Sequence, residues 1–339
     1  MSSACTIRDI AEAAQVSLET VSRVLNGKYK ASTQRGRDRV AQVRAIAAKL
    51  GYRPDPAAVA MRTGRTRLVG IIVENDSVFC HSVLLEFLAG ITETLEAAGY
   101  ATALTRLHHQ PFAQAGFSCQ ALDTRALDGA VVVDGLDLDL LQRLDLVLPA
   151  LVLVNSPGWG NTPAVMRDEA AAGALAGGRL ADAGYRRGIF LRKEPSAHPC
   201  YDQRWAGFAA GFAGPGRQAE ECRLALPFDD DARAHLRSLA ATDTVIVASD
   251  PLSALGLLDA FARMDLRIGI DVGLAALDEQ SGMDYSSPGL ARVSHDREAI
   301  GAAAAQLILA RIDGQAVEPG TRRLVGSWRA GCTAPGPGG

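Results

Sequence analysis

From Leu68 onward, short runs rich in Val, Ile and Leu alternate with longer Ala-rich amphipathic segments. Strands that alternate with helices along a chain pair in parallel, and the helices cover the faces of the sheet. The pattern predicts strands at 69–73, 101–105, 130–133, 151–154, 188–191, 244–248 and 272–276. It predicts helices at 82–98, 138–144, 169–183, 204–212, 252–264 and 297–312. This part of the chain is therefore expected to have an α/β fold.

Charge is distributed unevenly along the 339 residues. Residues 1–67 contain 13 Lys and Arg against 5 Asp and Glu, a net charge of +8. The rest of the chain holds 22 of the 35 basic and 33 of the 38 acidic side chains, a net charge of −11. A basic segment joined to an acidic body is typical of a protein whose first part binds a polyanion such as DNA.

The basic segment carries start and stop signals for three helices. Thr6 is a good N-cap for a helix at 7–14, and Ser17 is a good N-cap for a second helix that ends at Gly27. Thr33 is the expected cap of a third, amphipathic helix. Two short helices joined by about three residues predict a helix-turn-helix, whose second helix can enter the major groove of DNA.

The residues of these helices resemble a known family. Thr6-Ile-Arg-Asp-Ile-Ala-Glu-Ala-Ala is followed by Val16-Ser-Leu-Glu-Thr-Val-Ser-Arg-Val-Leu-Asn-Gly27 and by Leu50-Gly-Tyr-Arg-Pro54. This order looks like the lac repressor family of bacterial transcription regulators, and the likeness covers the first 67 residues densely. The resemblance implies a sequence-specific DNA-binding transcription regulator, expected to be a repressor.

The resemblance also implies which residues contact DNA. It assigns base reading to Leu18, Glu19 and Arg23. Arg can bind guanine O6 and N7 bidentately, Glu can accept from cytosine N4, and Leu can contact a thymine methyl. Phosphate contacts are expected from Thr20, Ser22 and Asn26. The alternative for Glu19 and Arg23 is a solvated ion pair one helical turn apart.

Residues 53–67 are expected to form a hinge. In the family this segment becomes helical on operator DNA, where paired hinge helices insert an apolar side chain into the minor groove, and Met61 stands at that place. Val59 stands where the family usually has Arg, and Gln15 stands where it usually has Gly. A left-handed conformation at Gln15 would cost about 1 kcal/mol. The alternative reading of 53–67 is a plain flexible connector.

The acidic body resembles the family as well. The matching pieces are Asp128–Val133, Leu153–Asn155, Asp168 with Ala183–Arg187, Arg204–Phe208, Ala248–Asp250 and Val272–Asp278. They imply a two-lobed fold like that of a periplasmic sugar-binding protein. The expected organisation is a helix-turn-helix head at 1–52, the hinge at 53–67, a two-lobed effector-binding and dimerisation domain at 68–334, and a flexible tail at 335–339.

In such a fold the ligand lies between the lobes, at the carboxyl ends of the strands. Asp168, Arg204, Asp250 and Asp278 stand at positions that contact effectors in relatives. Carboxylates accept hydrogen bonds from hydroxyls and Arg donates in a planar fork, so this set suits a sugar. A polar contact and a stacking face are also expected from Asn75, Asp76 and Phe79. The alternative for the charged residues is surface or interlobe ion pairing.

Several classes of protein find little support in the sequence. The chain carries no nucleophile elbow, Walker loop, dinucleotide fingerprint or zinc-protease motif, which argues against an enzyme and against a bound cofactor. The six cysteines are far apart and lack the spacing of a zinc site, so no metal is expected. Neither a secretory signal nor a membrane span is evident, and a cytoplasmic protein is expected.

The expected partners follow from these points. One head reads a half-site, so a homodimer on a palindromic double-stranded operator is predicted, together with a small sugar or related metabolite as effector. The leucine heptads that form tetramers in some relatives are absent. Two alternatives stay open: a sugar-binding transport-type protein, and a DNA-binding protein that has no effector.

Overall fold

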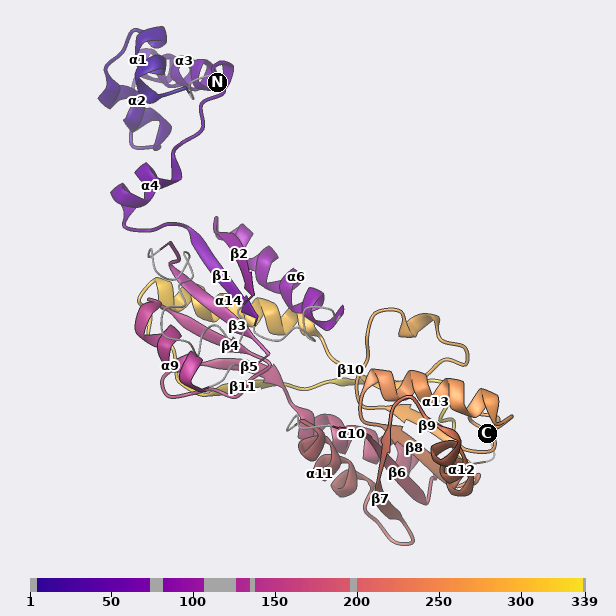
Figure 1. Cartoon of the computed structure of the whole chain (residues 1–339). Coiled ribbons are helices and arrows are strands. Elements are labelled where there is room, and N and C mark those ends of the chain that lie inside the picture. The colour runs from indigo at the N-terminus through magenta and orange to yellow at the C-terminus, as the bar shows by residue number, and fades with distance from the viewer. Residues whose placement is uncertain (1–4, 74–81, 107–125, 135–137, 196–199, 338–339) are drawn as a thin grey trace. The chain divides into compact units, whose positions relative to one another are not determined.

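The structure is a computed structural model that describes residues 5–73, 82–106, 126–134, 138–195 and 200–337 (Figure 1). Its contacts divide the chain into two compact units, Met1–Thr66 and Arg67–Gly339. Asn75, Asp76 and Phe79, from which a polar contact and a stacking face are expected, lie outside the described residues.

The first unit begins with the three predicted helices, α1 (Ile7–Ala14), α2 (Leu18–Leu25) and α3 (Gln34–Lys49). The predicted caps are confirmed, because the side chain of the residue before each helix accepts a backbone N–H of its first turn. One apolar cluster joins the three helices, formed by Ile10, Ala11, Ala14, Val21, Val24, Val43 and Ala47. A fourth helix, α4 (Pro56–Thr63), occupies the predicted hinge.

The backbone is left-handed at Gln15, in the turn between α1 and α2. Glycine, which the family usually has at this position, adopts that conformation readily. The φ of Gln15 is 54°, and its N–H donates to the carbonyls of Ala11 and Glu12. A side chain in this conformation costs about 1 kcal/mol, because Cβ crowds the following carbonyl. The surrounding helices therefore impose a conformation that glutamine itself disfavours.

The second unit contains two six-stranded sheets. The first has the order β11-β5-β4-β3-β1-β2, and all its pairings are parallel. Its strands are β1 (Leu68–Val73), β2 (Ala101–Arg106), β3 (Gly129–Val133), β4 (Leu151–Val154), β5 (Ala164–Arg167) and β11 (Thr321–Leu324). Its helices are α6 (Ser82–Ala97), α9 (Leu138–Val147) and α14 (Arg297–Ile312). We call this the first lobe.

The second lobe is built around the order β12-β10-β9-β8-β6-β7, in which only β12 is antiparallel to its neighbour. Its strands are β6 (Arg187–Glu194), β7 (Gln218–Ala225), β8 (Thr244–Ala248), β9 (Gly273–Ala276), β10 (Ala291–Ser294) and β12 (Ser327–Arg329). Its α-helices are α10 (Glu169–Asp182), α11 (Cys200–Phe212), α12 (Asp230–Leu239) and α13 (Pro251–Arg263), and a short 3₁₀ turn covers Met283–Tyr285.

The chain passes between the lobes at β5–α10, at β10–α14 and at β11–β12. Each lobe therefore combines segments that are far apart in the sequence. The short strands at these passages were not predicted, nor were β7 and α12. A four-residue strand such as β11, Thr321-Arg-Arg-Leu, is too short and too polar to show a period of two.

Glycines allow the two helices α10 and α11 to pack closely. A Cβ at Gly207 would lie 2.0 Å from the carbonyl oxygen of Ala170, whereas a Cβ at Gly178 of α10 would meet nothing within 4 Å. Gly207→Ala is therefore expected to lower the free energy of unfolding by about 1 to 3 kcal/mol. Gly178→Ala is the matched control and is expected to stabilise, because alanine favours the helix. Urea unfolding measures both, and equal effects would contradict the packing argument.

Residues 335–337, expected to belong to a flexible tail, pack against the second lobe. Gly336 is buried, and its N–H donates to the Tyr185 hydroxyl at 3.4 Å. Within the described residues, none of the helices combines the length and the apolar character needed to cross a bilayer.

Candidate functional site

The helix α2 has one buried and one open face. Val21 and Val24 point into the core of the first unit. Leu18 is 49% exposed, and the side chains of Glu19 and Arg23 are 80% and 52% exposed. The carboxylate and guanidinium of this pair are 3.7 Å apart, an exposed contact that contributes little to stability. The three side chains assigned to base reading therefore lie on the solvent face and can reorient at small cost.

The residues assigned to phosphates lie on the same helix and its end. The Thr20 hydroxyl is 2.9 Å from that of Ser17, and the Asn26 amide donates to the Ser22 carbonyl at 2.6 Å and to its hydroxyl at 3.2 Å.

Met61, on α4, is 90% exposed. An apolar side chain in this setting is available to contact a partner surface.

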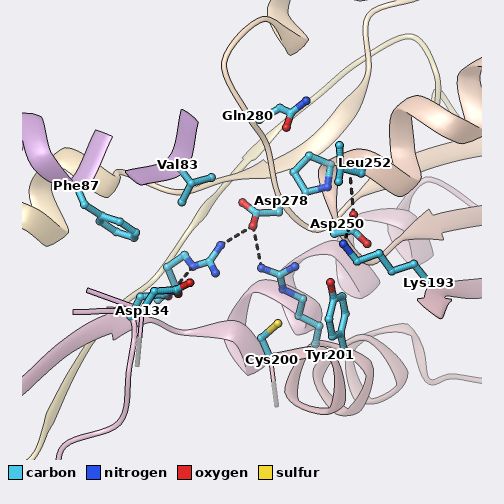
Figure 2. Close-up of a pocket in the computed structure, with 14 residues that line it drawn as sticks. Val83, Phe87, Asp134, Lys193, Cys200, Tyr201, Asp250, Leu252, Asp278 and Gln280 are labelled. Carbon is cyan, nitrogen blue, oxygen red and sulfur yellow. Dashed lines mark hydrogen bonds and ion pairs between the residues drawn. The ribbon is translucent and has the colours of Figure 1, made fainter. Parts of the chain in front are cut away.

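A pocket of about 220 Å³ opens between the two lobes of the second unit (Figure 2). Its lining brings together three of the residues predicted to bind an effector, Arg204, Asp250 and Asp278. Asp168 is not among the described lining residues. Its side chain accepts the Ala171 N–H at 2.9 Å as the N-cap of α10.

The base of the pocket is a closed ring of buried charges. Arg167, at the end of β5 in the first lobe, donates to Asp278 at 2.5 Å and contacts Glu169 at 2.9 Å. Arg204, on α11 in the second lobe, contacts the same two carboxylates, Glu169 at 2.6 Å and Asp278 at 2.9 Å. Each of these four side chains is at most 7% exposed. Buried charges are tolerated only when paired in this way.

Asp278 is the centre of the ring. One carboxylate oxygen accepts from Arg167 and Arg204, and the other accepts from Arg297 and from the backbone N–H of Glu279. Four bonds fill the acceptor positions of a carboxylate. Burial alone would raise the pKa of Asp278, but the guanidiniums of Arg167, Arg297 and Arg204 hold that pKa well below its usual range. Asp278 is thus a fixed negative charge.

Arg297 extends the ring across the lobes. It is the first residue of α14 and contacts Glu86 of α6 at 2.8 Å as well as Asp278. The neighbouring His295 is 4% exposed, and neither ring nitrogen has a hydrogen-bond partner among the described residues. Burial lowers the pKa of His295 to about 4, although the Asp278 carboxylate acts in the opposite direction. The imidazole is therefore neutral at physiological pH.

Asp250 is satisfied by its own helix. One oxygen accepts the N–H groups of Leu252 and Ser253, each at 3.1 Å, and the other accepts the hydroxyls of Ser253 at 2.7 Å and Ser249 at 3.2 Å. The Lys193 ammonium stays 3.7 Å away. Asp250 therefore positions α13 and the wall of the pocket.

Sequence reasoning missed several lining residues: Asp134, Asn155, Arg167, Lys193, Tyr201 and Gln280. A usable signal existed for some of them, because Asp134, Asn155 and Arg167 stand at or just after the ends of strands, where open α/β sheets form their sites. Burial raises the pKa of the Cys200 thiol to about 11, so this lining thiol is protonated at neutral pH. The described residues contain no group of His, Cys, Asp and Glu that could hold a metal ion.

Comparisons with known proteins agree with these two units. The model for bacterial regulatory proteins of the lacI family matches residues 6–55, and the model for a periplasmic binding protein-like domain matches residues 178–332. The transcriptional repressor CytR of Escherichia coli K12 is 26% identical over 329 residues, which cover 95% of this chain and 94% of that relative. The sucrose operon repressor of Klebsiella pneumoniae is 32% identical over 215 residues, 62% of either chain.

The lac repressor dimer, solved bound to operator and the anti-inducer ONPF, has a similar fold. Its TM-score is 0.77 at 18% identity, over 98% of this chain and 99% of that chain. The matches cover both the helical head and the two-lobed body, in the same order along the chain. The protein belongs to the lacI family of bacterial regulatory proteins and is a DNA-binding transcription regulator.

Proposed function

We propose that this regulator is a repressor that binds a palindromic operator as a homodimer in the cytoplasm. A small sugar or related metabolite between the lobes changes its operator affinity. The observation that supports this most directly is a DNA-binding head joined to a body whose pocket is lined by polar side chains from both lobes. A transport-type sugar-binding protein has no use for such a head.

DNA reading is assigned to the open face of α2. Leu18, Glu19 and Arg23 are exposed there, while the opposite face holds the helix on the core. Thr20, Ser22 and Asn26 then contact phosphates and fix the register of the helix in the groove. Met61 of α4 would insert into the minor groove beside its counterpart in the second protomer. Two heads related by a twofold axis account for a palindromic site.

Effector control is assigned to the pocket. Arg167 and Arg297 reach Asp278 across the lobes, so the relative position of the lobes depends on how these charges pair. A ligand that binds one lobe arrangement better than another shifts the population toward it. Because Arg67 and β1 follow directly on the head unit, a change in the lobes can alter the order of the hinge and thereby operator affinity.

Arg23→Ala tests the assignment of base reading. Affinity for the operator is expected to fall about 5- to 150-fold, because a bidentate contact to guanine contributes about 1 to 3 kcal/mol of discrimination. The operator is first selected from random DNA with the unmodified protein. Fluorescence anisotropy then measures binding of the variant to that operator, to each single base-pair change and to unrelated DNA.

The control for this experiment is Arg44→Ala, which removes an exposed arginine of α3. Any loss of affinity in Arg44→Ala is expected to be the same for all DNA sequences. The assigned role requires that Arg23→Ala lose its preference at one base pair in each half-site. Equal loss on every DNA sequence would show that Arg23 only contributes charge.

A further inference from the structure

The strongest charges in the pocket are not available to a ligand. Asp278 already accepts four hydrogen bonds, and Asp250 accepts four from α13 and Ser249. Arg204 uses its Nε on Glu169, one terminal nitrogen on the Ser249 carbonyl and the other on Asp278. A ligand that takes over any of these bonds must break the ring of charges or the capping of α13. Recognition therefore falls first to the lining groups that are still unoccupied.

The second lobe offers unoccupied donors at one end of the pocket. Lys193, near the end of β6, has a 28% exposed side chain, and its only polar contact within the described residues is the long one to Asp250. Asp250 cannot shorten that contact, because its acceptor positions are filled. The Tyr201 hydroxyl, on α11, has no hydrogen bond in the described part of the chain. Burial raises the Tyr201 pKa above its usual value, so this hydroxyl remains a donor.

The first lobe offers an acceptor at the other end. The Asn155 amide donates to one oxygen of Asp134 at 2.5 Å, and Arg167 supports Asn155 through its Nε at 3.3 Å. The second oxygen of Asp134 has no partner among the described residues. Figure 2 shows Asp134 at one side of the pocket, with Lys193 and Tyr201 at the other.

We propose that the effector is a small hydroxylated anion, a sugar acid or a sugar phosphate. Its carboxylate or phosphate binds Lys193 and Tyr201, and a hydroxyl at its far end donates to Asp134. An ammonium with open N–H groups is matched by an anion, and a free carboxylate oxygen is matched by a hydroxyl. A ligand placed in this way contacts both lobes at once. The volume of about 220 Å³ restricts it to about one sugar unit. This inference rests on the proposed function.

The test measures binding to the full chain with matched pairs of probes. Gluconate is paired with sorbitol, glucose 6-phosphate with glucose, and the corresponding pentose derivatives are paired in the same way. Isothermal titration calorimetry gives the affinity of the protein for each probe. Fluorescence anisotropy follows operator binding at the same probe concentrations. At least one anionic member is expected to bind and to change operator affinity, while its neutral partner binds at least tenfold more weakly. Comparing the carboxylate probes with the phosphate probes shows whether the effector is a sugar acid or a sugar phosphate.

Variants connect that preference to the named groups. Lys193→Met is expected to weaken the anionic probe about 10- to 100-fold, because a charge-assisted hydrogen bond is lost. Lys193→Arg should retain part of the affinity for the anionic probe. Tyr201→Phe should lower that affinity less than Lys193→Met does. Arg223→Met removes an exposed charge of the same lobe, from a side chain that is 51% exposed, and is the matched control. An unchanged anion affinity in Lys193→Met would overturn the proposal.

The outcomes separate this inference from the proposed function. If a neutral sugar alone binds and changes operator affinity, the anionic class is wrong while effector control stands. If no probe binds and operator affinity never changes, neither the anionic class nor sugar control holds.

Discussion

Replacing Asp278 by asparagine is expected to lower the free energy of unfolding of residues 67–339 by about 3 to 5 kcal/mol, the usual cost of breaking a buried ion pair on one side. Three guanidiniums, from Arg167, Arg204 and Arg297, converge on this carboxylate. Asparagine keeps the shape but removes the charge, and its NH₂ group faces donors. The variant therefore leaves buried positive charges without compensation.

Urea unfolding followed by tryptophan fluorescence measures this effect in the full chain. The three tryptophans, at 159, 205 and 328, all lie in the second unit, so the head does not contribute to the signal. Asp259→Asn is the control, because Asp259 pairs with Arg263 at 2.7 Å but its side chain is 63% exposed. The decrease in the free energy of unfolding of Asp259→Asn is expected to be far smaller. If both variants lose the same stability, the ring of buried charges is not a major stabilising element.

The second large effect is the loss of stability in mild acid that arises from His295. The pKa of this group is about 4 in the folded chain because burial disfavours the imidazolium, whereas the ordinary pKa of histidine is 6.5. The unfolded state therefore takes up the proton first as pH falls. About 3 kcal/mol of stability is expected to disappear between pH 6.5 and pH 4. Asp278 and Glu169 have lowered pKa values, so their contribution starts to be lost only as pH falls below about 5, where these carboxylates begin to protonate in the unfolded chain.

His295→Leu separates the pH range in which the histidine lowers stability from the more acidic range in which the carboxylates do. Leucine loses no hydrogen bond there, since neither imidazole nitrogen has a partner among the described residues. The variant is expected to keep a nearly constant free energy of unfolding between pH 6.5 and about pH 5. Below that pH its free energy of unfolding should fall only by the contribution of the carboxylates. His235→Gln, at an exposed position of α12, should retain the original slope. Urea unfolding across this pH range provides the comparison, and an unchanged slope in His295→Leu would contradict the assignment.

Much of the head could be predicted from local signals. Thr6, Ser17 and Thr33 are caps whose effect extends over one turn, and the apolar positions of α1 and α2 repeat at helical spacing. Such signals need no knowledge of the rest of the chain. The strands β1, β3, β4 and β8 were predicted for a similar reason, because buried parallel strands are continuous apolar runs.

The pocket could be predicted only in part. Arg204, Asp250 and Asp278 line it, yet the carboxylates and guanidiniums that contact Arg204 and Asp278 come from distant parts of the chain. Arg167 and Asp278 are 111 residues apart, and Arg297 and Glu86 are 211 apart. Nothing in the local sequence distinguishes an arginine that pairs with a distant carboxylate from one that binds a ligand.

By itself the sequence determined the helix-turn-helix head, the alternating α/β body and the family to which the chain belongs, because periodicity, capping and motif order act over short separations. Tertiary structure alone decided which charges are already paired and which are open to a ligand. The passages between lobes bring β5, β9 and α14 together at one point, and burial there makes an unpaired charge too costly to persist.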